Sequence, residues 1–252
     1  GRNGTLFRFV GSRILIKCYS FFVVIIFRLR KLNESEDIKM DILETMKARH
    51  SVRQYKNQAI ESSKREKINA LIKDVNAESK LSIQVFYDEP KCFDSFMAHY
   101  GKFENVKNYI AIVGNKNDQE KAGYYGEKIV LKCQKLGLNT CWVAMTHGKS
   151  KAQIKRGQKL LIIISLGYGE TQGVPHKSKS IAELGQADQK NEWFEKGMEA
   201  VSLAPTAVNQ QKFYFELKNG IVTAKNLGGF YSRIDLGIVK YHFEVVTGHE
   251  VK

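Results

Sequence analysis

Two short apolar runs, each ending in glycine, constrain the fold of this chain more than any other feature. They are NYIAIVG at residues 108–114 and LLIIISLG at 160–167. A short apolar run bounded by a turn residue is typical of a strand buried on both faces of a sheet. The stretch between them, 118–136, has apolar residues at helical spacing and is followed by Gly137, which favours a helix end. We therefore expect a buried sheet covered by helices.

The other segments add helices and strands in an irregular order. Asn219-Gly220 lies between two alternating runs and is a favoured pair for a two-residue hairpin turn, and Pro205 stops a preceding helix. This order lacks the regular βαβ alternation of a dinucleotide-binding fold, so the sequence predicts an α+β sandwich. The expected helices are 41–49, 61–80, 192–203 and 233–247, and the further expected strands are 81–87, 213–217 and 221–224.

The first 39 residues differ in character from the rest. Residues 14–27 are strongly apolar, but Lys17 interrupts them and leaves an unbroken run of only ten residues at 18–27. A membrane-spanning helix needs about 20 apolar residues. Three interpretations stay open: a segment outside the native fold, a membrane-surface anchor, or an arm that packs on a partner. The sequence thus divides into an extension, 1–39, and a domain, 40–252.

Charge and cysteine content limit the classes of function. The chain has 40 Lys and Arg against 26 Asp and Glu, a formal net charge of +14, which raises nucleic acid, an anionic membrane or a phosphorylated ligand as partners. The excess is shared between residues 1–39 and the remainder, so no single basic stripe predicts specific nucleic-acid binding, and membrane contact is expected only through 1–39. Four scattered cysteines and six histidines show no metal-binding spacing, and a cytoplasmic location fits best.

Two polar segments are candidates for a site. Arg49-His50-Ser51-Val52-Arg53 follows the first helix, and its guanidiniums and hydroxyl could hold a phosphate or form a solvated basic turn. Ala204-Pro205-Thr206-Ala207-Val208-Asn209-Gln210-Gln211 lies between a helix and a strand, and could line a planar polar ligand or form only a turn. Cys141 beside Trp142 is interpreted as a small buried hydrophobe rather than a nucleophile.

Four stretches of sequence from Met40 onward form a wider pattern. The stretches are RHSVR (49–53), GYYGEKIVLKCQKLGL followed by NTCWV (123–143), ISLGY with HKSK downstream (164–168 and 176–179), and APTAVNQQ (204–211). Together, and in this order, they make the chain from Met40 onward resemble the nitroreductase family of FMN-dependent oxidoreductases. The similarity is greatest to the branch in which the A-P-[ST]-A-x-N-x-Q segment lies late in the chain. It implies a three-layer sandwich with a central mixed β-sheet flanked by helices, and a homodimer with FMN at its interface.

The resemblance also implies a role for individual residues. Arg49, His50, Ser51 and Arg53 would bind the FMN phosphate and ribityl chain, with Arg53 reaching the N1/O2 edge of the flavin. Lys177 and Lys179 would approach the phosphate, and the backbone at Ala144 and Met145 would face flavin N5. Pro205, Thr206, Ala207 and Asn209 would contact the isoalloxazine from the second subunit. The chain departs from the family at Gln211-Lys212-Phe213, where Q-P-W is usual, and at 144–145, where Glu-Gly is common.

The resemblance therefore implies an FMN-dependent oxidoreductase that takes electrons from NADH or NADPH. It would reduce nitroaromatic, quinone or similar small electrophiles by ping-pong hydride transfer through flavin N5, with Arg53 as electrostatic support and no catalytic side chain. A flavin carrier or redox sensor with little turnover is the alternative. A basic protein that binds nucleic acid or a membrane surface is a third interpretation.

Overall fold

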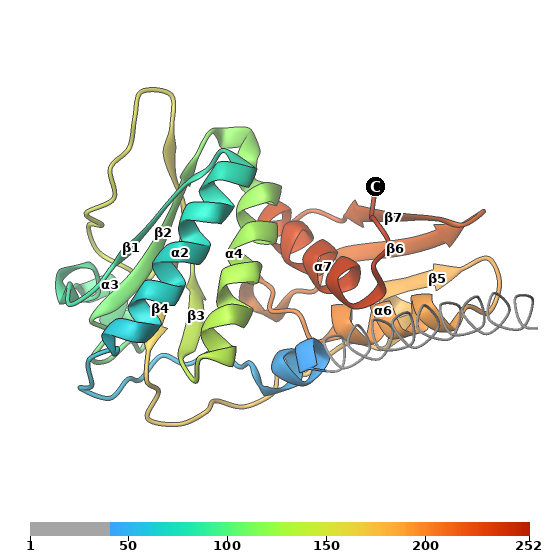
Figure 1. The fold of residues 1–252 in the computed structure, drawn as a ribbon. Coiled ribbons are helices and arrows are strands. Elements are labelled where there is room, and N and C mark those ends of the chain that lie inside the picture. The colour runs from blue at the N-terminus through green and yellow to red at the C-terminus, as the bar shows by residue number, and fades with distance from the viewer. Residues whose placement is uncertain (1–40) are drawn as a thin grey trace, which may run out of the picture. The chain divides into compact units, whose positions relative to one another are not determined.

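The computed structural model describes residues 41–252, of which 42–252 form one unit (Figure 1). The expected extension, 1–39, lies outside the described residues. None of the helices within 41–252 is long and apolar enough to cross a membrane. After a helix at 41–48, the elements are α2 (Ser62–Ser79), β1 (Ser82–Phe86), α3 (Phe96–Tyr100), β2 (Asn108–Gly114), α4 (Gln119–Lys135), β3 (Asn139–Val143), β4 (Lys159–Gly167), α5 (Ile181–Leu184), β5 (Gly185–Ala187), α6 (Glu192–Ser202), β6 (Phe213–Lys218), β7 (Ile221–Asn226) and α7 (Ser232–Thr247).

The two apolar runs form the centre of a four-stranded antiparallel sheet in the order β1-β2-β4-β3. Side chains alternate between its faces, as the strand period requires. Ile110 and Ile112 pack in the core shared with α2 and α4, whereas Tyr109 and Ala111 pack on the other face with Phe93 and its neighbours. The expected central strands are confirmed. Strand β3 was not predicted; its five residues begin shortly after the end of α4.

A second sheet of three strands, β5-β6-β7, lies against α7. The predicted hairpin is confirmed: β6 and β7 pair antiparallel around Asn219 and Gly220, which both have positive φ. The α+β class is also confirmed, but the single central mixed sheet implied by the resemblance is wrong for the described part of the chain. Helix α4 contacts the first sheet and α7 contacts the second. This helix pair lies between the sheets (Figure 1), and among residues 41–252 no backbone ladder joins them.

Helices α4 and α7 pack with almost no side chain between them at two glycines. A Cβ atom added to Gly123 would lie 1.9 Å from the carbonyl oxygen of Ile234, and one added to Gly237 would lie 1.9 Å from that of Glu120. The contact is reciprocal, because each glycine meets the carbonyl oxygen of the residue three positions before the other glycine. The two helices therefore cross with a local two-fold relation, and each needs glycine at the crossing point.

A buried charge cluster also joins the two helices. The carboxylate of Glu127 on α4 accepts a hydrogen bond from Trp142 Nε1 at 3.0 Å and lies 3.0 Å from Nε2 of His242 on α7. The Nε atom of Arg49 is 3.9 Å from the same carboxylate, and Nδ1 of His242 donates to the carbonyl of Ala200 at 2.8 Å. Burial raises the pKa of Glu127, but His242 and Arg49 oppose it and bring the net value below the ordinary range.

Candidate functional site

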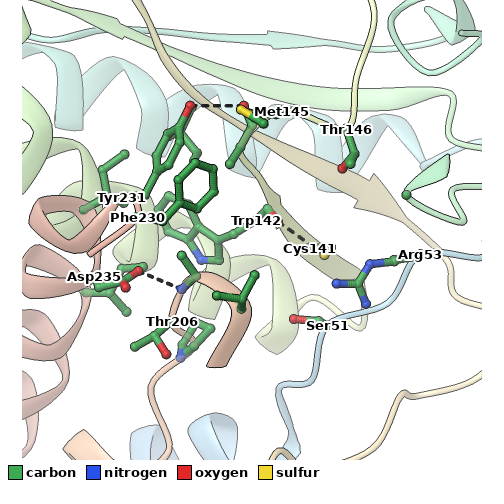
Figure 2. A pocket seen from close by; sticks show the side chains of 18 of the residues that line it. Ser51, Arg53, Cys141, Trp142, Met145, Thr146, Thr206, Phe230, Tyr231 and Asp235 are labelled. Carbon is green, nitrogen blue, oxygen red and sulfur yellow. Dashed lines mark hydrogen bonds between the residues drawn. The ribbon is translucent and has the colours of Figure 1, made fainter. Parts of the chain in front are cut away.

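A cavity of about 550 Å³ lies where the 51–53 segment, the end of β3, the 205–208 loop and the start of α7 meet (Figure 2). Residues 100–102 and 144–146 complete its wall. Sites for cofactors and small ligands have volumes of roughly 300–1,000 Å³ and combine apolar walls with a few polar groups. This cavity has both properties, because Trp142, Phe230 and Ile238 line it together with Ser51 and Arg53.

The 51–53 segment runs beside β3 like a short added strand. Ser51 pairs in parallel with Thr140, and the Val52 N–H donates to the Thr140 carbonyl at 3.0 Å. Val52 is buried while Ser51 and Arg53 face the cavity, which follows from the alternation of side chains along an extended segment. The buried Tyr55 hydroxyl donates to the Val52 carbonyl at 2.7 Å, and this bond holds the segment against the core.

Arg53 is placed to meet an anionic ligand. Its guanidinium carbon lies 5.9 Å from the centre of the Phe103 ring. Within residues 41–252, Arg53 has no carboxylate in ion-pairing distance, so its charge is not neutralised by another described side chain. A guanidinium of this kind forms strong hydrogen bonds with a carboxylate or a phosphate.

Strand β3 and the residues after it form a second wall. Cys141 lines the cavity but is only 2% exposed, and burial raises the pKa of its thiol above the ordinary value. A neutral, buried thiol is a poor nucleophile, which agrees with its interpretation as a small hydrophobe. Gly101 approaches Thr146 so closely that an added Cβ would lie 2.6 Å from Thr146 Cβ. This close approach sets the width of the cavity at that point.

The loop between α6 and β6 forms the third wall in a strained conformation. Val208, Asn209 and Gln211 all have left-handed φ values, of 47°, 53° and 46°. A left-handed conformation is uncommon for a β-branched residue and costs of order 1–3 kcal/mol. Val208 is nevertheless 85% exposed at the cavity. The loop therefore keeps this shape because contacts elsewhere hold it.

The fourth wall consists of Phe230, Tyr231 and the first turns of α7. The Tyr231 hydroxyl donates to the Ala144 carbonyl at 3.3 Å, next to Met145, and closes that side of the cavity (Figure 2). Asp235 is only 4% exposed and accepts hydrogen bonds from Ala207 N at 3.0 Å and from Gln210 Nε2 at 2.7 Å. Burial raises the pKa of Asp235 to about 6, although both donors oppose that effect. Sequence reasoning missed this wall.

A signal for Asp235 was present in the sequence. The apolar face of the last helix includes Ile234 and Ile238, and Asp235 is an acidic residue directly beside it. Carboxylates are seldom buried unless they have a partner, so an acidic side chain at this position indicates a hydrogen-bonded or functional group. Nothing in the local pattern identifies Ala207 and Gln210 as its partners, because they lie in a distant loop.

The structure brings together seven of the twelve residues expected at the flavin. Ser51, Arg53, Ala144, Met145, Pro205, Thr206 and Ala207 line the cavity. Arg49, His50, Lys177, Lys179 and Asn209 do not line it. The seven come from three separate stretches of a single chain. Pro205, Thr206 and Ala207, which the resemblance assigns to a second subunit, here share the cavity with Ser51 and Arg53 of their own chain.

Arg49 and His50 lie behind the cavity wall. Arg49 is 3% exposed, and burial lowers the pKa of its guanidinium despite the opposing charge of Glu127. Its Nε atom is buried without a hydrogen-bond partner. His50 is partly buried, and its pKa is lowered by burial and by the neighbouring Arg49 charge. Neither side chain forms the cavity surface, and only Arg49 carries a positive charge behind it, which Glu127 partly offsets.

Lys177, Lys179 and Asn209 meet on the outer side of the strained loop. Asn209 Nδ2 donates to the Lys177 carbonyl at 2.9 Å, and Lys179 Nζ donates to the Gln211 carbonyl at 3.2 Å. The buried Gln211 side chain accepts from Lys179 N at 2.8 Å and donates to the Lys177 carbonyl at 3.0 Å. These bonds fasten the loop to residues 177–179. Asn209, expected to contact the isoalloxazine, therefore bonds to protein instead.

Across residues 41–252, no three His, Cys, Asp or Glu side chains are grouped so that they could hold a metal ion.

Comparison with known proteins gives the class. The model of the family described as "Putative TM nitroreductase" matches residues 41–247. Because this match covers most of the chain, the protein belongs to that nitroreductase family. Among curated proteins, none matches.

One solved structure shows the same fold, and two others are similar over a smaller part of this chain. A "putative nitroreductase" from Thermotoga maritima MSB8 has a TM-score of 0.59 and 23% identity, and the match covers 81% of this chain and 82% of that one. An "FMN-dependent nitroreductase" from Clostridium difficile R20291 has a TM-score of 0.41 and 22% identity over 56% of this chain and 92% of that chain. A "putative nitroreductase in complex with FMN" from Desulfovibrio desulfuricans has a TM-score of 0.45 and 15% identity over 56% and 93% of the respective chains.

Proposed function

We propose that this protein is an FMN-dependent oxidoreductase whose single chain builds the whole flavin cavity. The observation that carries the proposal is one cavity of about 550 Å³ that unites the Ser51 and Arg53 segment with the 205–208 loop. The sequence resemblance assigns both segments to the same flavin, with the second segment coming from another subunit. Their meeting inside one chain supports a flavin site that needs no second subunit.

The residues present fit FMN. Arg53 lines the cavity and has no counter-charge among the described residues, so a negatively charged edge of the bound cofactor would meet an open guanidinium. Trp142, Phe230 and Ile238 supply flat apolar walls for a ring system. When bound, FMN supplies hydride exchange between a nicotinamide donor and a second substrate.

The side chains of this cavity then act by positioning, by charge and by excluding water. Ser51 and Arg53 hold the polar part of the cofactor, and the Arg53 guanidinium favours negative charge developing nearby. A cation about 4 Å from that charge contributes roughly 4 kcal/mol at an effective dielectric of 20, before solvent screening. The bond from Tyr231 to the Ala144 carbonyl closes one side against water. No side chain is needed as a nucleophile.

We further propose NADH or NADPH as the donor and nitroaromatic compounds, quinones or similar electrophiles as acceptors. Donor and acceptor would use the same cavity in turn, which gives ping-pong kinetics. The homodimer and the cytoplasmic location implied by the sequence stay predictions, and the cavity depends on neither. The departure at Gln211-Lys212-Phe213 lies just beyond the 205–208 loop and outside the cavity lining, so it would affect substrate choice only through the position of that loop.

A flavin titration with two arginine variants tests the proposal. Purified protein with FMN should show bands at roughly 370 and 450 nm, typical of oxidised flavin, and should oxidise NADH or NADPH when a quinone is added. Arg53→Ala should weaken FMN binding by about tenfold or more, because a charge-assisted contact is lost. Arg156→Ala, which removes an exposed arginine outside the cavity lining, should not. A protein that binds no FMN refutes the proposal, and one that binds FMN without turnover supports the flavin carrier instead.

A further inference from the structure

The strained 205–211 loop is held from two sides, and the two sides differ in chemistry. On the outer side, Gln211 and residues 177–179 hold it by bonds among neutral groups, together with the Lys179 ammonium. On the cavity side, it is held by a single ionisable group, the Asp235 carboxylate. The loop itself contains no ionisable side chain from Ala204 to Gln211.

Gln210 connects this carboxylate to the next wall of the cavity. The two hydrogens of its side-chain amide have separate acceptors: Nε2 donates to the Phe230 carbonyl at 2.6 Å and to Asp235 Oδ2 at 2.7 Å. The other carboxylate oxygen, Oδ1, accepts from Ala207 N at 3.0 Å. One small network therefore ties together the 205–208 loop, residues 230–231 and the first turn of α7, three of the segments that line the cavity.

We propose that Asp235 is a positioning residue of the flavin site, which holds the 205–208 loop and Phe230 in place through Ala207 and Gln210. This inference rests on the proposed function for the identity of the ligand. Asp235 needs to be a carboxylate in this role. An asparagine could still accept from Ala207 N, but its amide hydrogens would face those of Gln210. Turning the Gln210 amide would relieve that clash and place its oxygen against the Phe230 carbonyl instead.

The surroundings of the buried Asp235 carboxylate hold it in one position. No lysine or arginine lies within ion-pairing distance of Asp235 among residues 41–252, so it interacts with its surroundings through hydrogen bonds alone. A buried carboxylate with two good donors is held in one geometry. That geometry fixes Ala207 N and thereby the left-handed residue that follows it, Val208.

A double-mutant cycle tests the proposal at pH 8, where the carboxylate is ionised. The variants are Asp235→Asn, Gln210→Ala and the pair, each titrated with FMN. The matched control is Asp188→Asn, since Asp188 also accepts a backbone hydrogen bond, from Asn219 N, but at the exposed β6–β7 turn. Each single variant should weaken FMN binding by about tenfold. The pair should bind no more weakly than the worse single variant, because both act through one network.

A second measurement needs no flavin. In the FMN-free protein, trypsin cleavage after the exposed Lys212, directly beyond the loop, should be several-fold faster in Asp235→Asn than in wild type and unchanged in Asp188→Asn. Faster cleavage without FMN binding in any protein would support the positioning role and refute the proposed cofactor. FMN affinity within twofold of wild type, additive effects in the cycle, or equal cleavage rates would each overturn the positioning role.

Discussion

Helices α4 and α7 contribute equivalent residues to the contact between them, yet only α7 contributes residues to the candidate site. Gly123 and Gly237 occupy matching positions at the crossing. By the same spacing, Asp235 on α7 corresponds to Lys121 on α4. Asp235 is buried in the cavity wall, whereas Lys121 is exposed and pairs at 3.3 Å with Asp118, the residue that precedes α4.

The difference shows that helix packing and chemistry are specified by different residues. The glycines set how closely the helices approach, and this sets where the first turn of each helix lies. The side chains on that turn then decide the character of the space beside it: the first turns of α7 line the candidate site, whereas Gln119 and Glu120 of α4 line a separate hollow. On α7, Ile234 and Asp235 face the 205–208 loop side of the molecule. On α4, the equivalent Glu120 pairs with Lys240.

The largest effect is expected when the buried charge between the two helices is unbalanced. Glu127→Ala leaves His242 and Arg49 in the core without their carboxylate. Removing one partner of a buried pair costs about 4 kcal/mol of unfolding free energy. Urea denaturation measures this loss. Exposed Glu250→Ala is the control, and an equal, small effect in both variants would show that the cluster does not hold the helices together.

A slightly smaller loss is expected when the helix crossing itself is overfilled. In Gly237→Ala the new methyl would meet the backbone oxygen of Glu120, which cannot move aside as a flexible side chain would. Overpacking should cost about 3 kcal/mol even though alanine favours a helix. Gly123→Ala should behave alike, because the contact is reciprocal. Thermal unfolding of both variants against exposed Lys132→Ala checks this, and unequal losses at the two glycines would contradict the two-fold relation.

We expect the stability of the protein to depend on pH through Asp235, and not through Lys121, its counterpart on α4. Its pKa of about 6 lies above the ordinary 3.8, so the ionised form costs stability above pH 6. That cost disappears as the pH falls from 6 towards 3.8. When the pH is lowered from 7 to 4, the free energy of unfolding of the wild type should therefore rise by about 2 kcal/mol relative to that of Asp235→Asn. This is less than the full value of a two-unit shift in pKa, because water reaches the cavity. Parallel stability curves for the two proteins would refute this assignment.

The smallest effect on stability is expected at Lys121 on α4, the position that corresponds to Asp235 on α7. Lys121→Ala removes an exposed ion pair with Asp118 and should change stability by less than about 0.5 kcal/mol. It should leave FMN binding unchanged, since Lys121 is outside the cavity. A clear loss of FMN affinity in Lys121→Ala would mean that α4 also contributes its first turn to the ligand.

The sequence predicted the parts of the fold that depend on local pattern. The buried strands β2 and β4, the long helices and the Asn219-Gly220 turn all follow from periodicity or turn chemistry. The division into two sheets could not be predicted, because it depends on where α4 and α7 pack and not on any local motif. β3 was missed because five residues between a helix end and a loop carry little periodicity.

The candidate site was predictable where a motif carries both the side chain and its position. Ser51 and Arg53 follow from an extended segment, and Pro205 to Ala207 from a rigid turn. The position of Arg49 was not predictable. An arginine next to a helix end can face the cavity or, as here, turn towards a buried partner, and that partner, Glu127, lies 78 residues later in the chain. Asp235 was missed because its partners, Ala207 and Gln210, come from another segment.

Native mass spectrometry of the protein diluted to its monomer and mixed with FMN tests the central claim most directly. The claim that one chain builds the cavity predicts one FMN on each monomer, with occupancy unaffected by dilution apart from the mass action of FMN itself. Arg53→Ala should lose that occupancy under the same conditions. FMN found only on dimers, with bare monomers at saturating FMN, would contradict the account and return the 205–208 loop to a second subunit.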